Sequence, residues 1–195
     1  KIEKDIDAKY DSRNDNCVAD EDCLGFEPLK RFSGVLIGNN KTIKNLYINR
    51  ADEDSVGLFR SLAAGAKVTG LKLDSISISG KNYVGGLAGV DNGAVIDSVR
   101  LIVNVEGVDY VGGIVGKKAA GSVNRSYTKG YVVGRNDVGG ILGSVANASL
   151  ENSYSIANVK GDVNVGGLVG SAVQADFSKV YAVGNVDAGE SVARK

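Results

Sequence analysis

Oxygen-bearing side chains gather near the N-terminus in a pattern that could bind a metal ion. They are Asp11, Asn14, Asp15, Asp20 and Asp22. Carboxylate and amide oxygens are the ligands that Ca²⁺ prefers. The spacing departs from the EF-hand loop, because Arg13 stands at the third position and no glycine stands at the sixth. The stretch therefore leaves two hypotheses open, a calcium site of another type and a solvated acidic loop.

The two cysteines of the chain, Cys17 and Cys23, belong to the same acidic stretch. Two cysteines cannot supply the four ligands of a zinc site, and the sequence has no histidine to complete one. A disulfide between them is our preferred interpretation, and it would indicate an oxidising compartment. The alternative is a pair of free thiols. A bridge over so short a loop would stabilise a local turn more than the whole fold.

Tyrosine recurs at a constant spacing of 27 residues, at Tyr127, Tyr154 and Tyr181. A row of exposed aromatic rings could bind the flat faces of sugars, because such rings combine an apolar face with a polar tip. Alternatively, the rings could stack on one another and stabilise the fold. Asn158 and Asn185 share the spacing and predict a hydrogen-bonded structural ladder.

Catalytic combinations of residues are hard to find in this sequence. Without histidine there is no Ser-His-Asp triad and no Cys–His pair. Glycoside cleavage needs paired carboxylates, and the acidic residues of the repeats occupy different positions of the period. These residues are Asp91, Asp97, Glu106, Asp109, Asp137, Glu151 and Asp162. Residues 112–117 are one residue short of a phosphate-binding loop, and Lys118 stands where Ser or Thr would hold Mg²⁺. We therefore predict a protein that is not an enzyme and has no cofactor, apart from the calcium ion considered above.

The elements that must position these side chains follow a repeat. Val-Gly-Gly-[Leu/Ile]-x-Gly begins at Val84, Val111, Val138 and Val165, 27 residues apart each time, and a weaker copy begins 28 residues earlier at Val56. Helical repeats need a 3.6-residue apolar period and tolerate few glycines. Here valine is abundant and glycine interrupts the chain every few residues. Three short strands in each unit predict an all-β fold, a three-sided parallel β-solenoid whose coils stack about 4.8 Å apart.

We expect one continuous domain with two regions. Residues 1–55 would form irregular coils that cover one end and include the acidic loop with its cysteines, and residues 56–195 would form the repeats, the last of which is cut short. Lysine and arginine balance aspartate and glutamate at 23 each, so nothing implies a general attraction to nucleic acid or to an anionic membrane. No apolar run is long enough for a membrane helix. Because the chain begins at Lys1, we expect a fragment of a longer chain with flanking domains.

The repeated Gly-[Leu/Ile]-x-Gly resembles the GLUG motif. Its flanking glycines are Gly86 and Gly89, Gly113 and Gly116, Gly140 and Gly143, and Gly167 and Gly170. The upstream residues 38–50, followed by Val56-Gly57-Leu58-Phe59, resemble the segment that often precedes GLUG repeats in large bacterial surface proteins. The resemblance covers nearly the whole chain. It implies a right-handed parallel β-helix in which the repeated glycines are structural and no residue is catalytic.

GLUG repeats occur in exported bacterial proteins, among them adhesin-like proteins and the non-catalytic region of IgA-specific metallopeptidases. The resemblance thus implies an extracellular or cell-surface location. We predict a non-catalytic adhesin or stalk segment that meets a glycan or protein ligand on a host or environmental surface. The first alternative is an accessory region of a surface metallopeptidase, and the second is a carbohydrate-binding or carbohydrate-cleaving β-helix.

Overall fold

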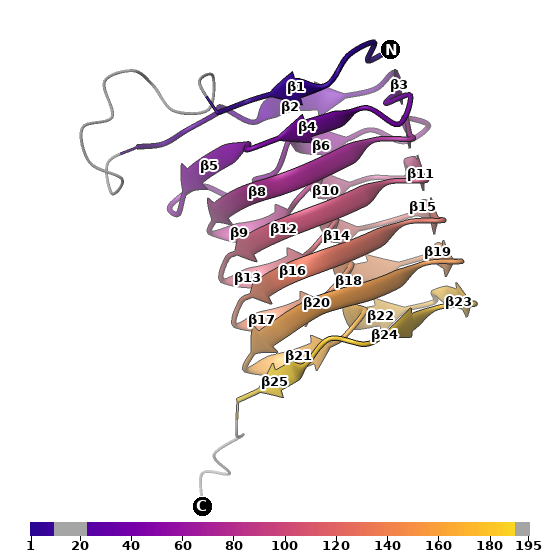
Figure 1. Ribbon diagram of the computed structural model, residues 1–195. Coiled ribbons are helices and arrows are strands. Elements are labelled where there is room, and N and C mark those ends of the chain that lie inside the picture. The colour runs from indigo at the N-terminus through magenta and orange to yellow at the C-terminus, as the bar shows by residue number, and fades with distance from the viewer. Residues whose placement is uncertain (10–22, 190–195) are drawn as a thin grey trace, which may run out of the picture.

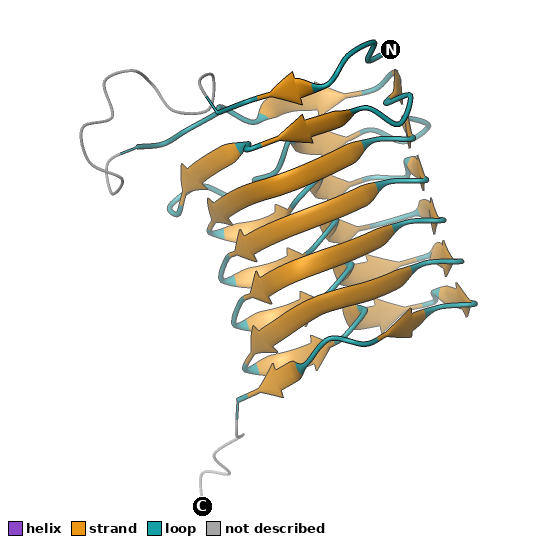
Figure 2. Ribbon diagram, viewed as in Figure 1, coloured by secondary structure: helices purple, strands orange, loops and turns teal. Residues whose placement is uncertain are grey.

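The computed structural model describes residues 1–9 and 23–189, and within these ranges its regular secondary structure is β-strand alone. The strands form flat faces in which each strand pairs in parallel with the strand one coil further along the chain (Figure 1). Two of the sheets contain six strands each, so the described chain winds through about six coils. Short loops join the faces (Figure 2). The predicted all-β solenoid with 27-residue coils is confirmed.

Four parallel sheets make up the coils, here named A to D. Sheet A comprises β1 Ile6–Asp7, β4 Thr42–Lys44, β5 Tyr47–Arg50, β8 Lys72–Gly80, β12 Arg100–Glu106, β16 Tyr127–Val133, β20 Tyr154–Gly161, β24 Tyr181–Ala182 and β25 Val186–Ala188. Sheet B comprises β2 Leu29–Phe32, β6 Phe59–Leu62, β10 Ala88–Asp91, β14 Val115–Lys118, β18 Leu142–Ala146 and β22 Val169–Val173. Sheet C comprises β3 Val35–Ile37, β7 Lys67–Thr69, β11 Val95–Asp97, β15 Gly121–Asn124, β19 Ala148–Glu151 and β23 Asp176–Ser178. Sheet D comprises β9 Asn82–Gly85, β13 Asp109–Gly112, β17 Asn136–Gly139 and β21 Val163–Gly166.

The core lies inside the coil and is built from columns of like residues. In β12 the burial alternates strictly, with Leu101, Val103 and Val105 pointing inward, because successive side chains of a strand point to opposite faces. The 27-residue register places equivalent residues on top of each other, so Val111 pairs with Val138 of the next coil and both are fully buried. Each coil therefore covers the apolar surface of its neighbour, and most of the stability lies in the contacts between coils.

Sheet D is a feature that the sequence did not predict. Three strands were expected in each unit, but the motif from Val138 to Gly143 is divided between two sheets, because β17 ends at Gly139 and β18 begins at Leu142. The backbone also turns inside sheet D, where Tyr110 and Asp137 adopt left-handed φ angles of 59° and 52°. Sheets A, B and C thus form the three long sides, and the short sheet D leads the chain from A into B.

The 28-residue spacing at the start of the repeats has a local cause. Leu73 pairs with Leu101, 28 residues later, whereas Ile76 pairs with Val103, 27 residues later. The extra residue is accommodated by a bulge in β8, where Ser75 is exposed and has a φ of 55°. A bulge inserts one residue into one strand and leaves the rest of the ladder in register.

The region that we assigned to irregular coils, residues 1–55, already contributes regular strands. Strands β2 to β5 pair with β6, β7 and β8 in sheets A, B and C. Strand β1 pairs with β4 at the edge of sheet A (Figure 1). The solenoid therefore includes residues from Leu29 onward, upstream of the boundary that we placed at residue 56.

Glu53 joins two arginines where the chain leaves β5. Its carboxylate accepts hydrogen bonds from Arg60 at 2.6 Å and from Arg50 at 2.8 Å. The hydrogen bond from Arg60, and then that from Arg50, lower the pKa of Glu53 below its usual value. Because the folded pKa is depressed, the stabilisation is present above the unfolded pKa and is lost as the pH falls through the folded one.

We expect Glu53→Gln to flatten the pH dependence of stability. Between about pH 6 and pH 3 the melting temperature of the parent chain should fall further than that of the variant, because only the parent has this carboxylate to protonate. Thermal unfolding followed by circular dichroism measures both. Asp52→Asn, at the neighbouring exposed residue, is the control and should keep the parent's dependence. Equal slopes for the parent and Glu53→Gln would contradict the assignment.

Candidate binding face

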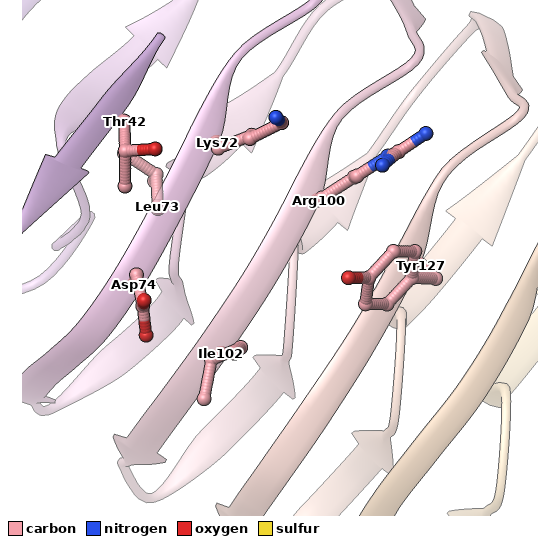
Figure 3. Close-up of a pocket in the computed structure, with 7 residues that line it drawn as sticks. All are labelled: Thr42, Lys72, Leu73, Asp74, Arg100, Ile102 and Tyr127. Atoms are coloured by element: carbon pink, nitrogen blue, oxygen red, sulfur yellow. The ribbon is translucent and has the colours of Figure 1, made fainter. Parts of the chain in front are cut away.

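A shallow hollow on the outer face of sheet A is the first candidate site (Figure 3). It has a volume of about 220 Å³ and crosses strands β4, β8, β12 and β16. Its lining residues are Thr42, Lys72, Leu73, Asp74, Arg100, Ile102 and Tyr127. The bulge at Ser75 lies next to Asp74, so the same irregularity that absorbs the extra residue also borders the hollow.

Two cations stand side by side at this hollow. Lys72 and Arg100 are register partners on β8 and β12, and no ion pair within residues 1–9 and 23–189 includes either of them. Like charges directly opposite each other on a sheet are unfavourable. An anionic group bound between them would relieve that repulsion. A carboxylate or sulfate fits best, because the guanidinium group can donate two parallel hydrogen bonds to it.

The tyrosine column forms a stack that continues from Arg100. The ring centroids of Tyr127 and Tyr154 are 5.0 Å apart, and those of Tyr154 and Tyr181 are 5.1 Å apart, with nearly parallel planes. The Arg100 guanidinium lies 5.9 Å from the centroid of the Tyr127 ring. The ring faces between Arg100 and Tyr181 are therefore covered by neighbouring groups of the column, which supports the stabilising stack.

Removing the central ring should cost stability. Tyr154→Leu breaks two ring pairs, each worth about 0.5–1.5 kcal/mol beyond its buried area, so we expect a loss of about 1–3 kcal/mol in the free energy of unfolding. Tyr131→Leu is the matched control, since Tyr131 is also an outward tyrosine of sheet A but is 57% exposed and has no stacked ring in the described chain. Chemical denaturation measures both. A loss no larger for Tyr154→Leu than for Tyr131→Leu would contradict the stack.

A second aromatic stack was missed by the sequence analysis. The rings of Tyr83 and Tyr110 stack at 4.9 Å in sheet D, and the Lys117 ammonium lies 5.7 and 5.6 Å from their centroids. The signal was available, because Tyr83 and Tyr110 are also 27 residues apart. The next two residues of this column are Asp137 and Asn164, and Asn164 donates a hydrogen bond to Asp137 at 2.7 Å.

The asparagine ladder is short. The Asn185 backbone N–H donates to the Asn158 side-chain oxygen at 3.0 Å, as the shared spacing predicted. One coil earlier, the position is occupied by Tyr131, which pairs with both Asn104 and Asn158. The ladder therefore joins only the last two of these coils.

Four of the seven repeat carboxylates bind a cation or an amide of the next coil. Asp97 accepts from Arg125 at 2.6 Å and Asp109 from Asn136 at 2.7 Å. Asp91 is buried against Lys118, and Asp137 binds Asn164 as above. These carboxylates hold coils together. The stretch that resembled a phosphate-binding loop, residues 112–118, runs from the end of β13 through β14.

The predicted metal ligands Asp11, Asn14, Asp15, Asp20 and Asp22 lie outside the described residues, as does Cys17. Cys23 is described and is 1% exposed, and its disulfide with Cys17 stays a prediction. Across the two described ranges no group of three or more Asp, Glu, His or Cys side chains could hold a metal ion. A helix capable of crossing a membrane is also absent from those ranges.

The glycines of the Gly-[Leu/Ile]-x-Gly motif lie where coils approach most closely. A Cβ atom on Gly86, Gly113 or Gly140 would meet the carbonyl oxygen of the equivalent glycine one coil later. On Gly116 it would come within 2.6 Å of the Tyr110 carbonyl oxygen. Real Cβ atoms keep at least about 3 Å from such atoms. No side chain larger than that of glycine fits at these positions between the coils. This agrees with a structural role for the motif.

Comparison with known proteins gives one partial match. A 76-residue stretch is 41% identical to part of Halomucin from Haloquadratum walsbyi (strain DSM 16790 / HBSQ001), and it covers 36% of this chain and 1% of that protein. The chain thus spans a very small share of the relative that it matches. No family model and no solved structure matches the chain.

Proposed function

We propose that this chain is a non-catalytic segment of an extracellular surface protein, and that the outer face of sheet A binds an anionic surface ligand. The observation that carries the proposal is the pair Lys72 and Arg100, which stand opposite each other beside the hollow without a carboxylate partner in the described chain. The ligand class is a glycan with carboxylate or sulfate groups. Proteins with acidic surfaces also present carboxylate groups, so the test measures their binding beside that of the glycans.

The architecture supports a role as a spacer. Successive coils repeat the same strand arrangement and the same apolar columns, so the solenoid lengthens by adding units and contacts between coils keep it stiff. The resemblance to GLUG repeats also favours a surface protein. The partial match to Halomucin, a large surface protein, favours the same location. The accessory region of a surface metallopeptidase and the carbohydrate-cleaving β-helix are less well supported, because no observed feature favours either one.

Binding to an immobilised glycan panel tests the proposal. The full chain should bind acidic glycans better than neutral ones, and the binding should weaken as the salt concentration rises, because exposed charges are screened. Lys72→Gln/Arg100→Gln should lower the affinity for acidic glycans at least about tenfold, since two charge-assisted hydrogen-bonding groups are lost.

The control variant removes the same number of positive charges, but at positions outside the hollow. Lys30→Gln/Lys67→Gln removes two exposed cations, one on sheet B and one on sheet C, neither of which lines the hollow, and should leave the affinity within about twofold of the parent. An equal loss in both double variants would show that net charge alone governs binding. Binding of acidic proteins but of no glycan would replace the glycan by a protein ligand, and release of new sugar ends would favour the carbohydrate-cleaving alternative.

A further inference from the structure

A buried ion pair joins two neighbouring coils on the inner side of sheet B. Asp91 on β10 and Lys118 on β14 are register partners 27 residues apart, and both side chains are fully buried. The Lys118 Nζ lies 2.5 Å from Asp91 Oδ2 and donates a second hydrogen bond to the Ala94 carbonyl oxygen at 2.9 Å. The same column continues with buried Leu62 on one side and buried Val145 on the other.

The second carboxylate oxygen is held in a way that suits chemistry at the carboxyl carbon. Asp91 Oδ1 accepts the backbone N–H groups of Gly93 at 2.9 Å and Ala94 at 2.7 Å. Two preorganised N–H donors on one oxygen are the arrangement that stabilises an oxyanion when a nucleophile adds to a carbonyl carbon. Oδ2 carries the ammonium group instead and accepts no backbone N–H from the residues that the structure describes.

Burial also favours the uncharged form of the lysine. Desolvation lowers the pKa of Lys118, against the opposing effect of the Asp91 carboxylate. An ion pair taken out of water loses much of its solvation, and the mutual attraction seldom restores it fully. Transfer of one proton from Lys118 Nζ to Asp91 Oδ2, which lie 2.5 Å apart, would therefore give a neutral amine beside a carboxylic acid.

We propose that Asp91 and Lys118 condense to an intramolecular amide that links the two coils covalently. The Lys118 ammonium first passes a proton to Asp91 Oδ2. The amine lone pair then forms the Nζ–Cγ bond, and the negative charge moves to Oδ1, where the Gly93 and Ala94 N–H groups hold it. Collapse restores the carbonyl and breaks the Cγ–Oδ2 bond, and Oδ2 leaves as water with a second proton from the nitrogen. The remaining amide N–H keeps the Ala94 carbonyl as its acceptor.

Atoms and charge balance, since a carboxylate and an ammonium give one amide and one water, and no oxidant or other reactant is required. The link would close a 27-residue span between adjacent coils and constrain the unfolded chain as a disulfide does. It depends only on the geometry of the pair and does not rest on the proposed function. A failure to bind glycans would not contradict the proposed amide link.

Mass spectrometry of the purified full chain decides the proposal. After incubation in the folded state, reduction and denaturation, the intact mass should be lower than the sequence mass by one water. Trypsin should then release residues 82–100 joined to residues 118–125 through Asp91 and Lys118, because a modified Lys118 is no longer cleaved. Lys118→Arg keeps the cation but offers no amine, so this variant should show the full mass.

Two results would overturn the link. The first is a folded parent chain with the full sequence mass. The second is the loss of water in a linear peptide, which would mean that Asp91 has cyclised onto its own backbone at Asp91-Asn92. Loss of ammonia confined to Asn92-Gly93 is a separate reaction, and the masses distinguish it.

Discussion

Gly113→Ala is expected to destabilise the chain by about 3 kcal/mol, the upper range for an overpacked core. The added Cβ would meet the Gly140 carbonyl oxygen of the next coil, and it would lie 2.9 Å from the methyl carbon of Thr128. Backbone atoms of a stacked strand cannot move aside as a flexible side chain can. Relief would require the two coils to separate, which would weaken the hydrogen bond from the Gly113 N–H to the Gly139 carbonyl.

Gly34→Ala is the matched control for Gly113→Ala. A Cβ on Gly34 would make only ordinary contacts of 3.5 and 3.6 Å with the Phe32 ring, and its φ lies outside the left-handed region. We expect this variant to stay within about 0.5 kcal/mol of the parent. Urea unfolding followed by circular dichroism gives both values. Equal stabilities for the two variants would show that the motif glycines are not required by the approach of the coils.

The period and the columns of the fold could be predicted from the sequence, because identical residues recur where identical contacts are made. Val84, Val111 and Val138 were recognised as one column, and all three side chains are fully buried. Sheet D could not be predicted, because its turn depends on left-handed backbone angles at Tyr110 and Asp137. Tyrosine gives no signal for that conformation, and aspartate, although enriched in it, adopts other conformations more often.

The candidate site was harder to predict than the fold. The tyrosine column was identified, but only the structure shows that Arg100 covers the Tyr127 ring and that Lys72 faces Arg100. Arg100 lies one 27-residue period before Tyr127, but the bulge at Ser75 makes the next step back, from Arg100 to Lys72, 28 residues long. Lys72 therefore goes unnoticed when the constant period is extended backward.

The pair Asp91 and Lys118 was within reach of the sequence and was still missed. The two residues are opposite in charge and one period apart. Charged residues are almost never fully buried unless they are paired, and the sequence analysis treated Asp91 only as one of the scattered carboxylates. Lys118 occupies an inward position on β14, where neighbouring coils have Leu62 and Val145.

Lys118→Met should cost at least about 3–5 kcal/mol in the free energy of unfolding, the range for removing one partner of a buried ion pair, because the variant also cannot form the proposed link. Methionine fills most of the lysine volume, so the loss reports the charge more than a cavity. The Asp91 carboxylate would stay buried with only the Gly93 and Ala94 N–H groups to hold Oδ1. Oδ2 would lose its only partner within residues 1–9 and 23–189, and an unpaired buried charge is strongly unfavourable.

Asp91→Asn/Lys118→Met separates the unpaired charge from the loss of packing. The asparagine oxygen can still accept the Gly93 and Ala94 N–H groups, so the turn after β10 is kept while the charge is removed. We expect the double variant to be more stable than Lys118→Met alone, and less stable than the parent, which alone has the link between the coils. A double variant as unstable as Lys118→Met would mean that the lysine acts through its bulk. With Asp91→Asn measured as the second single variant, a coupling energy of at least about 1 kcal/mol in the double-mutant cycle is what a direct contact requires.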